Sequence, residues 1–512
     1  MAALARSLFM YGLLPIALWY SKWFVNSAPA KYSFDMNKYV KQNSSMTKKD
    51  LLDVAAILGQ LNEISMGYKL EFMEKKATDH TQNVFGLGSY EQGRNVTILE
   101  NDDPAPSNIS GSPGTYLFEG DILLTPLQAN SILEEVKSQT QANQVRAKRS
   151  AVLHDRLAKW PDMPIKYILD PSIGPPERKA IDEALEFWRT HTCLWFQHDP
   201  YIKDGDYLSF FKGDDDSCYS HVGKVGGKQP ISIGRNCAKM GYVAHEIGHA
   251  LGMWHEQARP DSEQYIQILW QNVKNDMTNN FLKRSWQQTE TYGIPYDMGS
   301  VMHYGPYAFT SNDKHMTIET HVPAYRATIG QREAPSFLDV KAVNKLYCEG
   351  KCQTQFSCSN GGYTHPGFCN GCLCPDGLGG IYCDSAESSK NAACGGLVYV
   401  NDDWTNISSP NYPEHYSNNQ RCSWILRAPS GRRIALEFID IFQLACGPTC
   451  TDYVEVKNDT QFVNTGMRYC CFEKPNYRIY SQSNEMIVIF NSGFTTFNGF
   501  KARVIQYPNS KP

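Results

Sequence analysis

His245-Glu246-Ile247-Gly248-His249-Ala250-Leu251-Gly252-Met253-Trp254-His255 is the most informative run of residues in this chain. On a helix, His245 and His249 lie one turn apart on the same face, so both imidazoles can bind one ion. A continuous helix would place His255 about 15 Å from His245 along the axis, which is too far to share a metal. Gly252 stands where a helix ends in a left-handed residue. The spacing therefore predicts a helix that stops there and a third ligand that folds back.

Three neutral imidazoles leave one position on a zinc ion open for water, and zinc lowers the pKa of that water toward about 7. Glu246 follows the first ligand directly and is placed to take the water's proton and pass it to a leaving amine. The alternative is a surface helix with two histidines and an unrelated third, which would require all of these positions to coincide. The run predicts one Zn²⁺ per chain, bound by His245, His249 and His255.

The pattern HExxHxxGxxH is that of the metzincin proteases. Ser300-Val301-Met302-His303-Tyr304 supplies their methionine turn, and Glu256 follows the third histidine. Together these residues resemble the astacin family of zinc endopeptidases. The resemblance covers residues 150–348 and implies an α+β protease domain, in which Tyr304 stabilises the oxyanion. It also implies that Glu256 anchors the new N-terminus, at Ser150 or Ala151, after a propeptide is removed.

The same resemblance carries expectations for other parts of this domain. It pairs Cys193 with Cys348 and Cys218 with Cys237, and it suggests that Tyr207–Phe211 is the edge strand that pairs with an extended substrate. The residues themselves predict a strand at Ile165–Leu169. They also predict a helix that opens at Pro175-Pro176, with Ala180, Ile181, Ala184, Leu185 and Trp188 on its buried stripe.

Residues 31–149 are polar, contain no cysteine and are interpreted as a propeptide. A helical pattern runs from Lys48 to about Ile64, and its apolar stripe is Leu51, Leu52, Ala55, Leu58 and Leu61. Arg146-Ala147-Lys148-Arg149 predicts cleavage between Arg149 and Ser150 by a furin-like protease. Phe118-Glu119-Gly120-Asp121 resembles the astacin propeptide motif, which implies that Asp121 binds the zinc in place of water.

Cysteines dominate the C-terminal part of the chain: all sixteen fall at or after Cys193. Six lie between Cys352 and Cys383, too short a segment for a hydrophobic core, and residues 349–384 resemble a disulfide-rich EGF-like module. Alternating apolar residues from Cys394 onward predict an all-β sandwich, and Ser409-Pro410-Asn411-Tyr412-Pro413 resembles a CUB domain over residues 394–507. The residues just before Cys352 predict no calcium site in the EGF-like module. In the CUB domain, none is predicted from the run Phe490-Asn491-Ser492-Gly493.

Most of the cysteines are expected in disulfides, while the partners of Cys446, Cys450, Cys470 and Cys471 stay open. The cysteines assigned to bridges are Cys193, Cys348, Cys218, Cys237, Cys352, Cys369, Cys358, Cys372, Cys374, Cys383, Cys394, Cys422, Cys446 and Cys470.

The compartment is predicted from the N-terminus and from the sequons. An apolar run from Leu8 to Tyr20 is shorter than the roughly 20 residues that a spanning helix needs, so residues 1–30 are interpreted as a signal peptide and no stable membrane insertion is expected. Disulfides also favour an oxidising, extracellular location. A formal charge of −4 provides no basis for nucleic-acid binding. Predicted glycosylation sites are Asn43, Asn95, Asn108, Asn406 and Asn458.

These observations favour a secreted zinc metalloendopeptidase made as a latent zymogen, acting on extracellular or cuticle and matrix proteins. The alternative is a catalytically silent scaffold that binds partners through its CUB and EGF-like modules. Loss of Glu246 or of one histidine would favour the scaffold, and all four residues are present. The substrate, the choice among cuticle remodelling, hatching and feeding, and the oligomeric state are not determined by the sequence.

Overall fold

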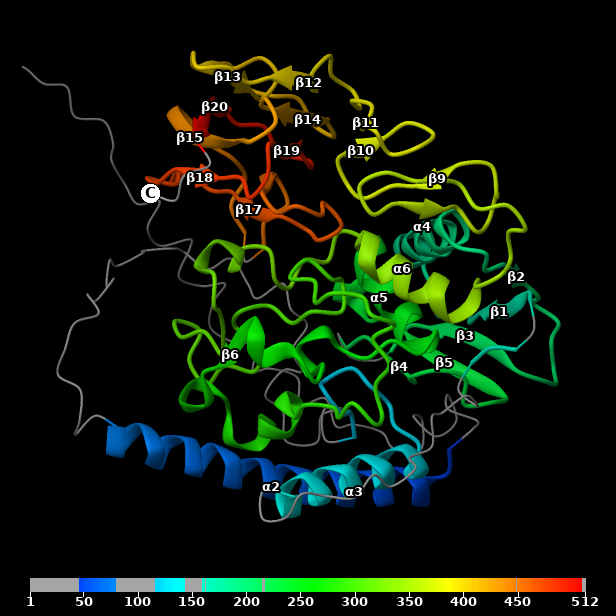
Figure 1. Ribbon diagram of the computed structural model, residues 1–512. Helices are drawn as coiled ribbons and strands as arrows, with labels where there is room; N and C mark the ends of the chain where they lie inside the picture. The colour runs from blue at the N-terminus through cyan, green and yellow to red at the C-terminus, as the bar shows by residue number, and fades with distance from the viewer. Residues whose placement is uncertain are drawn as a thin grey trace, which may run out of the picture.

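The structure is a computed structural model that describes residues 46–79, 116–142, 159–161, 163–213, 217–447 and 449–508. Figure 1 shows a central domain with two helices of the N-terminal region along one side and a β-sandwich on the other. We call residues 46–142 the N-terminal region, residues 159–348 the central domain and residues 394–508 the C-terminal sandwich. In the described part of the chain, no helix has the length and apolar character needed to cross a membrane.

The central domain is built on a five-stranded sheet with the order β2-β1-β3-β5-β4. Only β4 runs antiparallel to its neighbour. Its strands are β1 Ile165–Leu169, β2 Phe196–His198, β3 Tyr207–Phe211, β4 Tyr219–Ser220 and β5 Lys228–Ser232. The strand predicted at 165–169 is confirmed. The prediction that Tyr207–Phe211 is an edge strand is wrong, because β3 pairs on both sides and β4 forms the edge.

The helices of the central domain enclose one hydrophobic core with this sheet. They are α4 Pro175–His191, α5 Met240–Ala250 and α6 Phe337–Tyr347. The start of α4 at Pro175 and its buried stripe are confirmed. Shorter elements are the hairpin β6 Ile266–Ile268 and β7 Ile318–Thr320, and the 3₁₀ helices η4 Arg235–Cys237, η5 Glu256–Ala258, η6 Ser262–Gln264, η7 Trp270–Asn272, η8 Asn275–Phe281 and η9 Pro323–Tyr325.

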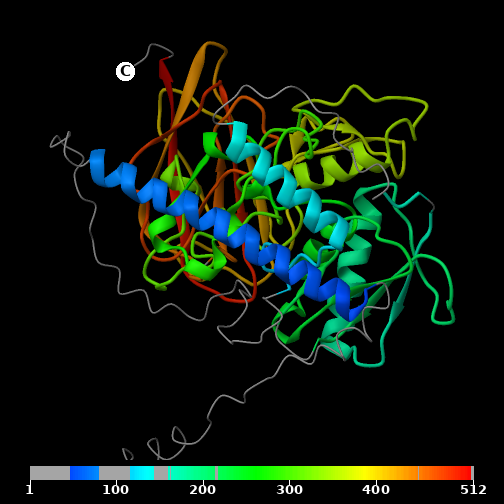
Figure 2. The same ribbon diagram turned by 90° about the horizontal axis from the view of Figure 1, so that it is seen from below.

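Two helices make up most of the N-terminal region, α2 Lys48–Asp79 and α3 Pro126–Ala142. They cross the same face of the central domain, as the view from below shows (Figure 2). The predicted helix begins at Lys48 as expected but continues well beyond Ile64. Leu51, Leu58 and Leu61 are buried, whereas Leu52 is 48% exposed and Val54 takes its place in the core. The predicted stripe was therefore wrong at Leu52, because α2 buries only a narrow face.

The N-terminal region shares a core with the central domain. Leu51, Leu61 and Leu117 pack in one apolar cluster with Phe211 and Leu282. The helix α2 also contributes a polar side chain to the contact. The Lys69 ammonium donates to the Val273 carbonyl at 2.8 Å and to Asn275 Oδ1 at 2.7 Å. Burying apolar area and satisfying polar groups together stabilise such a docked segment.

Between the central domain and the sandwich lies a small module closed by three disulfides, Cys352–Cys369, Cys358–Cys372 and Cys374–Cys383. Its strands are two residues long: β8 Tyr363–Thr364, β9 Cys372–Leu373, β10 Leu378–Gly379 and β11 Ser385–Ala386. With so little regular structure, the disulfides must supply much of its stability. Its identification as EGF-like stays a prediction.

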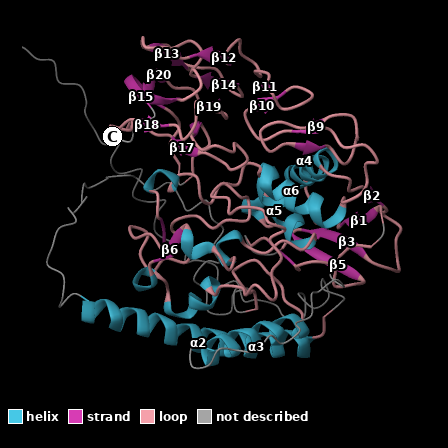
Figure 3. Ribbon diagram, in the orientation of Figure 1, coloured by secondary structure: helices cyan, strands magenta, loops and turns pink. Residues whose placement is uncertain are grey.

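The C-terminal sandwich consists of two sheets, ordered β12-β14-β19-β16-β17 and β13-β20-β15-β18, that enclose a common apolar core. Figure 3 shows this part of the molecule as strands and loops, whereas the labelled helices lie in the N-terminal region and the central domain. The strands are β12 Gly396–Tyr399, β13 Thr405–Ser408, β14 Arg421–Arg427, β15 Arg432–Gln443, β16 Tyr453–Lys457, β17 Met467–Tyr469, β18 Ile479–Tyr480, β19 Glu485–Asn491 and β20 Gly499–Pro508.

The remaining disulfides join cysteines within one domain. In the central domain, Cys193 pairs with Cys348 and Cys218 with Cys237, as the resemblance implied. In the sandwich, Cys394 pairs with Cys422. The pairings that the sequence left open are Cys446–Cys471 and Cys450–Cys470. No free cysteine occurs among the residues described.

Candidate metal centre

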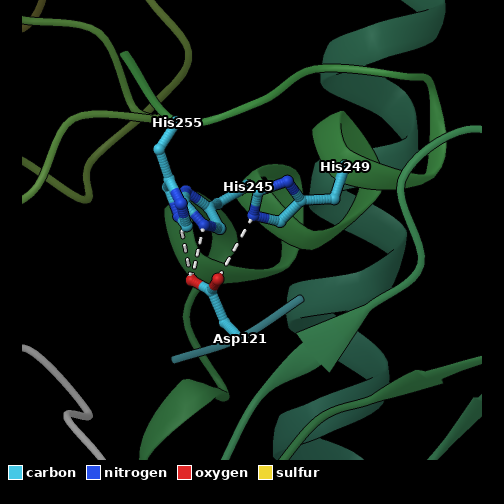
Figure 4. Close-up of side chains that lie close together, drawn as sticks. All are labelled: Asp121, His245, His249 and His255. Atoms are coloured by element: carbon cyan, nitrogen blue, oxygen red, sulfur yellow. Dashed lines mark hydrogen bonds and ion pairs between the residues drawn. The ribbon is translucent and has the colours of Figure 1, made fainter. Parts of the chain in front are cut away.

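The helix α5 and the turn after it bring the three predicted histidines together. α5 ends at Ala250, and Gly252 has φ 105°, a left-handed conformation that glycine adopts without steric cost. The indole nitrogens of Trp188 and Trp160 bind the carbonyls of Ala244 and Ala250, at 3.1 and 2.9 Å, which fixes the helix against the core. The turn returns His255 to within 4.8 Å of His249, His245 and Asp121, measured between their ligand atoms (Figure 4).

Each histidine is oriented by an acceptor on its Nδ1 atom. Nδ1 of His245 lies 2.8 Å from the Val301 carbonyl, and Nδ1 of His249 lies 2.8 Å from the Met253 carbonyl. Nδ1 of His255 lies 2.6 Å from Glu119 Oε2. Because these partners only accept, each Nδ1 carries the proton and each Nε2 presents a lone pair to the shared space.

Asp121 completes this set from the N-terminal region. Its Oδ2 lies 3.1 Å from Nε2 of both His245 and His255, and its Oδ1 lies 3.6 Å from Nε2 of His249 (Figure 4). Oδ1 of Asp121 and Nε2 of His249 are buried without hydrogen-bond partners. Lone pairs that converge on one point require a cation between them, and three imidazoles with one carboxylate match the tetrahedral set that zinc prefers. The residues therefore fit Zn²⁺.

Glu246 and Tyr304 border the histidines. Glu246 is 3% exposed, and its Oε2 has no hydrogen-bond partner. Burial raises its pKa above the usual value, and the Asp121 carboxylate raises it further. The Tyr304 hydroxyl donates to the Glu119 carbonyl at 2.5 Å, and its ring packs against that of His255. Both predicted residues thus lie at the metal centre.

Met302 packs against α5, the helix that carries His245 and His249. Its side chain is fully buried, and its sulfur would lie 3.1 Å from a Cβ placed on Gly248. Glycine at that position of α5 lets the helix and the methionine turn pack closely. The preceding residue, Val301, supplies the carbonyl that orients His245, so the turn both supports and orients the ligands.

The segment that carries Asp121 is held along the edge of the sheet. Ile122 bridges Ser220 of β4 in parallel, Ser220 N–H donates to the Asp121 carbonyl at 3.0 Å, and Leu123 N–H donates to the Ser220 carbonyl at 2.9 Å. Gly120 has φ 82°, and a Cβ there would lie 2.6 Å from the Phe309 ring. The chain turns at Gly120 because only glycine fits against that ring.

A buried ion pair fastens α3 beside this edge. Glu135 Oε2 lies 3.2 Å from Nη1 of Arg284, and their side chains are 4% and 5% exposed. The Arg284 guanidinium also lies 4.4 Å from the centre of the Trp254 ring, one residue before the ligand His255. Burial lowers the pKa of Arg284, so the Glu135 carboxylate compensates a charge that the interior disfavours.

Glu256 is engaged within its own domain. Its Oε1 accepts from the Asp297 N–H at 2.9 Å and from Arg259 Nη1 at 3.2 Å, and burial raises its pKa to about 8. Its predicted partner, the new N-terminus at Ser150 or Ala151, lies outside the described residues. The anchoring therefore stays a prediction.

Several other predicted sites cannot be placed. The cleavage site at Arg149, the signal peptide and the sequons Asn43, Asn95 and Asn108 also lie outside the described residues. Asn406 is exposed on β13. The Asn458 amide nitrogen, where a glycan would attach, donates to the Tyr480 carbonyl at 2.9 Å. Of the two described sequons, Asn406 is therefore the more accessible.

Glu119 and the Glu135–Arg284 pair belong to the centre but were not predicted from the sequence. Glu119 lies in the Asp121 motif, and a carboxylate so close to a proposed metal ligand could have been examined as a partner for a histidine. The Glu135–Arg284 pair left no such signal, because it joins residues from two domains that show no local pattern.

Comparisons with known proteins agree with this geometry. The family model of the astacin peptidases matches residues 152–348, and the CUB domain model matches residues 394–504. The zinc metalloproteinase nas-36 of Caenorhabditis elegans is 41% identical over 463 residues, which cover 90% of this chain and 72% of that protein. The zinc metalloproteinase dpy-31 of the same species is 37% identical, with coverage of 89% and 76%.

Among solved structures, the hatching enzyme zinc-protease high choriolytic enzyme 1 of Oryzias latipes is 31% identical, with a TM-score of 0.35. The match covers 39% of this chain and 98% of that one. The long matches to curated metalloproteinases and the family model place the sequence in one group. This chain belongs to the astacin family of zinc metalloproteases.

Proposed function

We propose that the chain is a secreted metalloendopeptidase, made as a latent zymogen, that hydrolyses peptide bonds of extracellular or cuticle and matrix proteins. The observation that carries the proposal is the set of four side chains, His245, His249, His255 and Asp121, whose ligand atoms meet within 4.8 Å. Three of them come from the central domain and the fourth from the N-terminal region. The site is thus complete for zinc binding while one position is held by a removable segment.

Bound zinc would polarise a peptide carbonyl and acidify a water molecule, and His245, His249 and His255 would hold it. Glu246 is the general base of the proposal. Its buried, unpaired Oε2 is a strong proton acceptor because the low-dielectric surroundings disfavour its charge. The same carboxyl can then deliver the proton to the leaving amine.

Tyr304 is the proposed oxyanion stabiliser. Its hydroxyl donates to a peptide carbonyl of the N-terminal region, that of Glu119, at 2.5 Å. A substrate carbonyl in the corresponding place would receive the same hydrogen bond, which strengthens as negative charge develops on the oxygen. The ring is held against His255 and Phe309, so the donor is oriented before the substrate arrives.

Latency follows from the path of the N-terminal region. Asp121 occupies the position that a water or substrate oxygen requires, and residues 121–123 cover the β4 edge where an extended peptide would pair. We infer that a furin-like protease cuts after Arg149 and that departure of the segment opens both places. Glu256, whose pKa is raised by burial, then accepts the new amino group at Ser150 or Ala151.

The C-terminal modules extend the proposal to partners. The CUB domain and the EGF-like module would direct the enzyme to extracellular proteins. A catalytically silent scaffold is the weaker hypothesis, because Glu246 and all three histidines occupy one buried site.

The test is cleavage of a denatured protein substrate by the chain before and after processing at Arg149, with Glu246→Gln as the matched variant. We expect activity to appear on processing, to be lost with the metal, and to fall by about 10²–10⁴ in Glu246→Gln, because the amide cannot accept the proton. Equal zinc content in both proteins would exclude loss of the metal as the cause. Absence of activity in every processed, zinc-loaded form would refute the proposal and favour the scaffold.

A further inference from the structure

We infer that the C-terminal sandwich positions the active site of the central domain through Thr465, a residue of the β16–β17 hairpin. The inference rests on the proposed function, since it assigns the sandwich a part in the same reaction. It differs from a substrate-docking role, because it concerns the geometry of the metal centre itself. Figure 1 shows β17 on the side of the sandwich that faces the central domain.

The hairpin reaches a buried carboxylate of the central domain. Thr465 N–H donates to Asp297 Oδ1 at 3.1 Å, and its hydroxyl donates to Asp297 Oδ2 at 3.2 Å. The neighbouring Asn464 amide donates to the Tyr296 carbonyl at 3.3 Å. Asp297 is 1% exposed and also accepts from the Gly299 N–H at 3.1 Å. A buried carboxylate must be hydrogen-bonded, and the sandwich provides two of its donors.

The contact is shaped on both sides. A Cβ on Gly299 would lie 2.3 Å from the Thr465 side chain, so the absence of a side chain at 299 leaves the space that Thr465 fills. Val463 packs in an apolar cluster with Ile294 and Phe337 of the central domain. The close fit, the apolar packing and the paired hydrogen bonds together indicate a fixed interface.

Thr328 of the central domain binds the β17 side of the hairpin. The Thr328 hydroxyl donates to the Gly466 carbonyl at 3.2 Å and accepts from the Arg468 N–H at 3.0 Å. Arg468 is also 3.5 Å from Glu333. These contacts hold the β17 side of the hairpin against the central domain.

Two short hydrogen-bonded steps connect Asp297 to the metal ligands. The Asp297 N–H donates to Glu256 Oε1 at 2.9 Å, and Glu256 is the residue directly after the ligand His255. The Glu256 N–H in turn donates to the Met302 carbonyl at 3.0 Å, and the adjacent Val301 carbonyl orients His245. A shift of the Asp297 segment would therefore change the support of two ligands, at a site where small displacements reduce the rate.

The test uses the full, processed chain with Thr465→Val, which keeps the shape and removes the hydroxyl, and Thr465→Ser, which restores it. Thr495→Val is the matched control, because the Thr495 hydroxyl donates to the buried Asp452 within the sandwich at 3.0 Å. The readouts are kcat and KM on a short peptide, which is too small to need a docking surface, and the rate of zinc loss to a chelator. All variants are compared at equal folded concentration.

We expect Thr465→Val to lower kcat about fivefold to tenfold with KM unchanged, and to speed zinc loss by a similar factor, as the loss of one hydrogen bond to a carboxylate implies. Thr465→Ser and Thr495→Val should behave like the natural chain. Equal kcat and zinc loss in Thr465→Val, an effect confined to protein substrates, or an equal effect of Thr495→Val would overturn the inference. If the natural chain cleaves nothing, the proposed function fails, while the zinc-loss rates still decide this inference.

Discussion

The N-terminal region and the β16–β17 hairpin both reach the central domain from outside it, on different sides and with opposite consequences. The N-terminal region contacts the open face of the metal centre, where Asp121 takes a ligand position. The hairpin contacts the segment behind the ligands, where Thr465 satisfies Asp297. The first contact blocks chemistry and is made by a segment ahead of a predicted cleavage site. The second supports the site and remains after cleavage.

Burial alone does not separate a blocking contact from a supporting one. Asp121 and Asp297 are both carboxylates held by groups from another part of the chain. The two residues differ in what they contact. Asp121 occupies a ligand position of the metal centre that the proposed reaction needs. Asp297 contacts backbone groups that the proposed reaction leaves in place. Removing the two contacts should therefore change activity in opposite directions.

The strongest way to weaken the blocking contact is at Glu135. Glu135→Leu leaves the Arg284 cation buried without its carboxylate, and breaking such a pair weakens docking by a factor of about 10²–10³. After processing at Arg149, the cut N-terminal region should leave the enzyme at correspondingly higher concentration. Activity on a peptide during serial dilution of the processed mixture measures this release.

Glu134→Leu is the control for this prediction, because the Glu134 side chain is 74% exposed and pairs only loosely with Lys137. It should release the segment at the same concentration as the natural chain. If both variants release the segment equally, the Glu135–Arg284 pair does not hold α3 in place.

A smaller effect is expected from pH. His221 is fully buried beside the segment that pairs with β4, and burial lowers its pKa to about 4. Its ordinary pKa is about 6.5. Since the docked state disfavours the charged ring, docking is at full strength above pH 6.5 and weakens as the pH falls from 6.5 toward 4. Between pH 6.5 and 5.5, His221 should weaken docking by less than about tenfold.

The measurement is the dilution midpoint of the processed mixture as a function of pH, with His221→Gln as the comparison. The glutamine variant cannot gain this proton, so its midpoint should vary less over the window. A pH dependence that is unchanged by the substitution would assign the effect to other groups.

The sequence predicted the parts of the centre whose geometry is local. The spacing of His245, His249 and His255 with Gly252 required a helix and a turn, and both are present. The stripe of α4 was equally local. The apolar pattern that includes Leu52 predicted a wider buried face than α2 has. Which of these side chains are buried depends on the surface that the helix packs against.

Contacts between distant residues could not be predicted in this way. Thr465 and Asp297 are 168 residues apart, and Arg284 and Glu135 come from the central domain and the N-terminal region, so no periodicity or motif links either pair. The prediction that β3 is an edge strand was wrong for a similar reason, because the composition of a strand does not determine the order of strands in a sheet. Only the folded arrangement shows β4 at the edge, with residues 121–123 along it.

The claim that Asp121 is a metal ligand in the unprocessed chain is tested most directly by substituting Co²⁺ for zinc and recording the visible absorption spectrum. Band positions and intensities depend on the ligands and their geometry. We predict a four-coordinate spectrum that changes in Asp121→Ala and stays the same in Glu134→Ala. Identical spectra for the natural chain and Asp121→Ala would contradict the account.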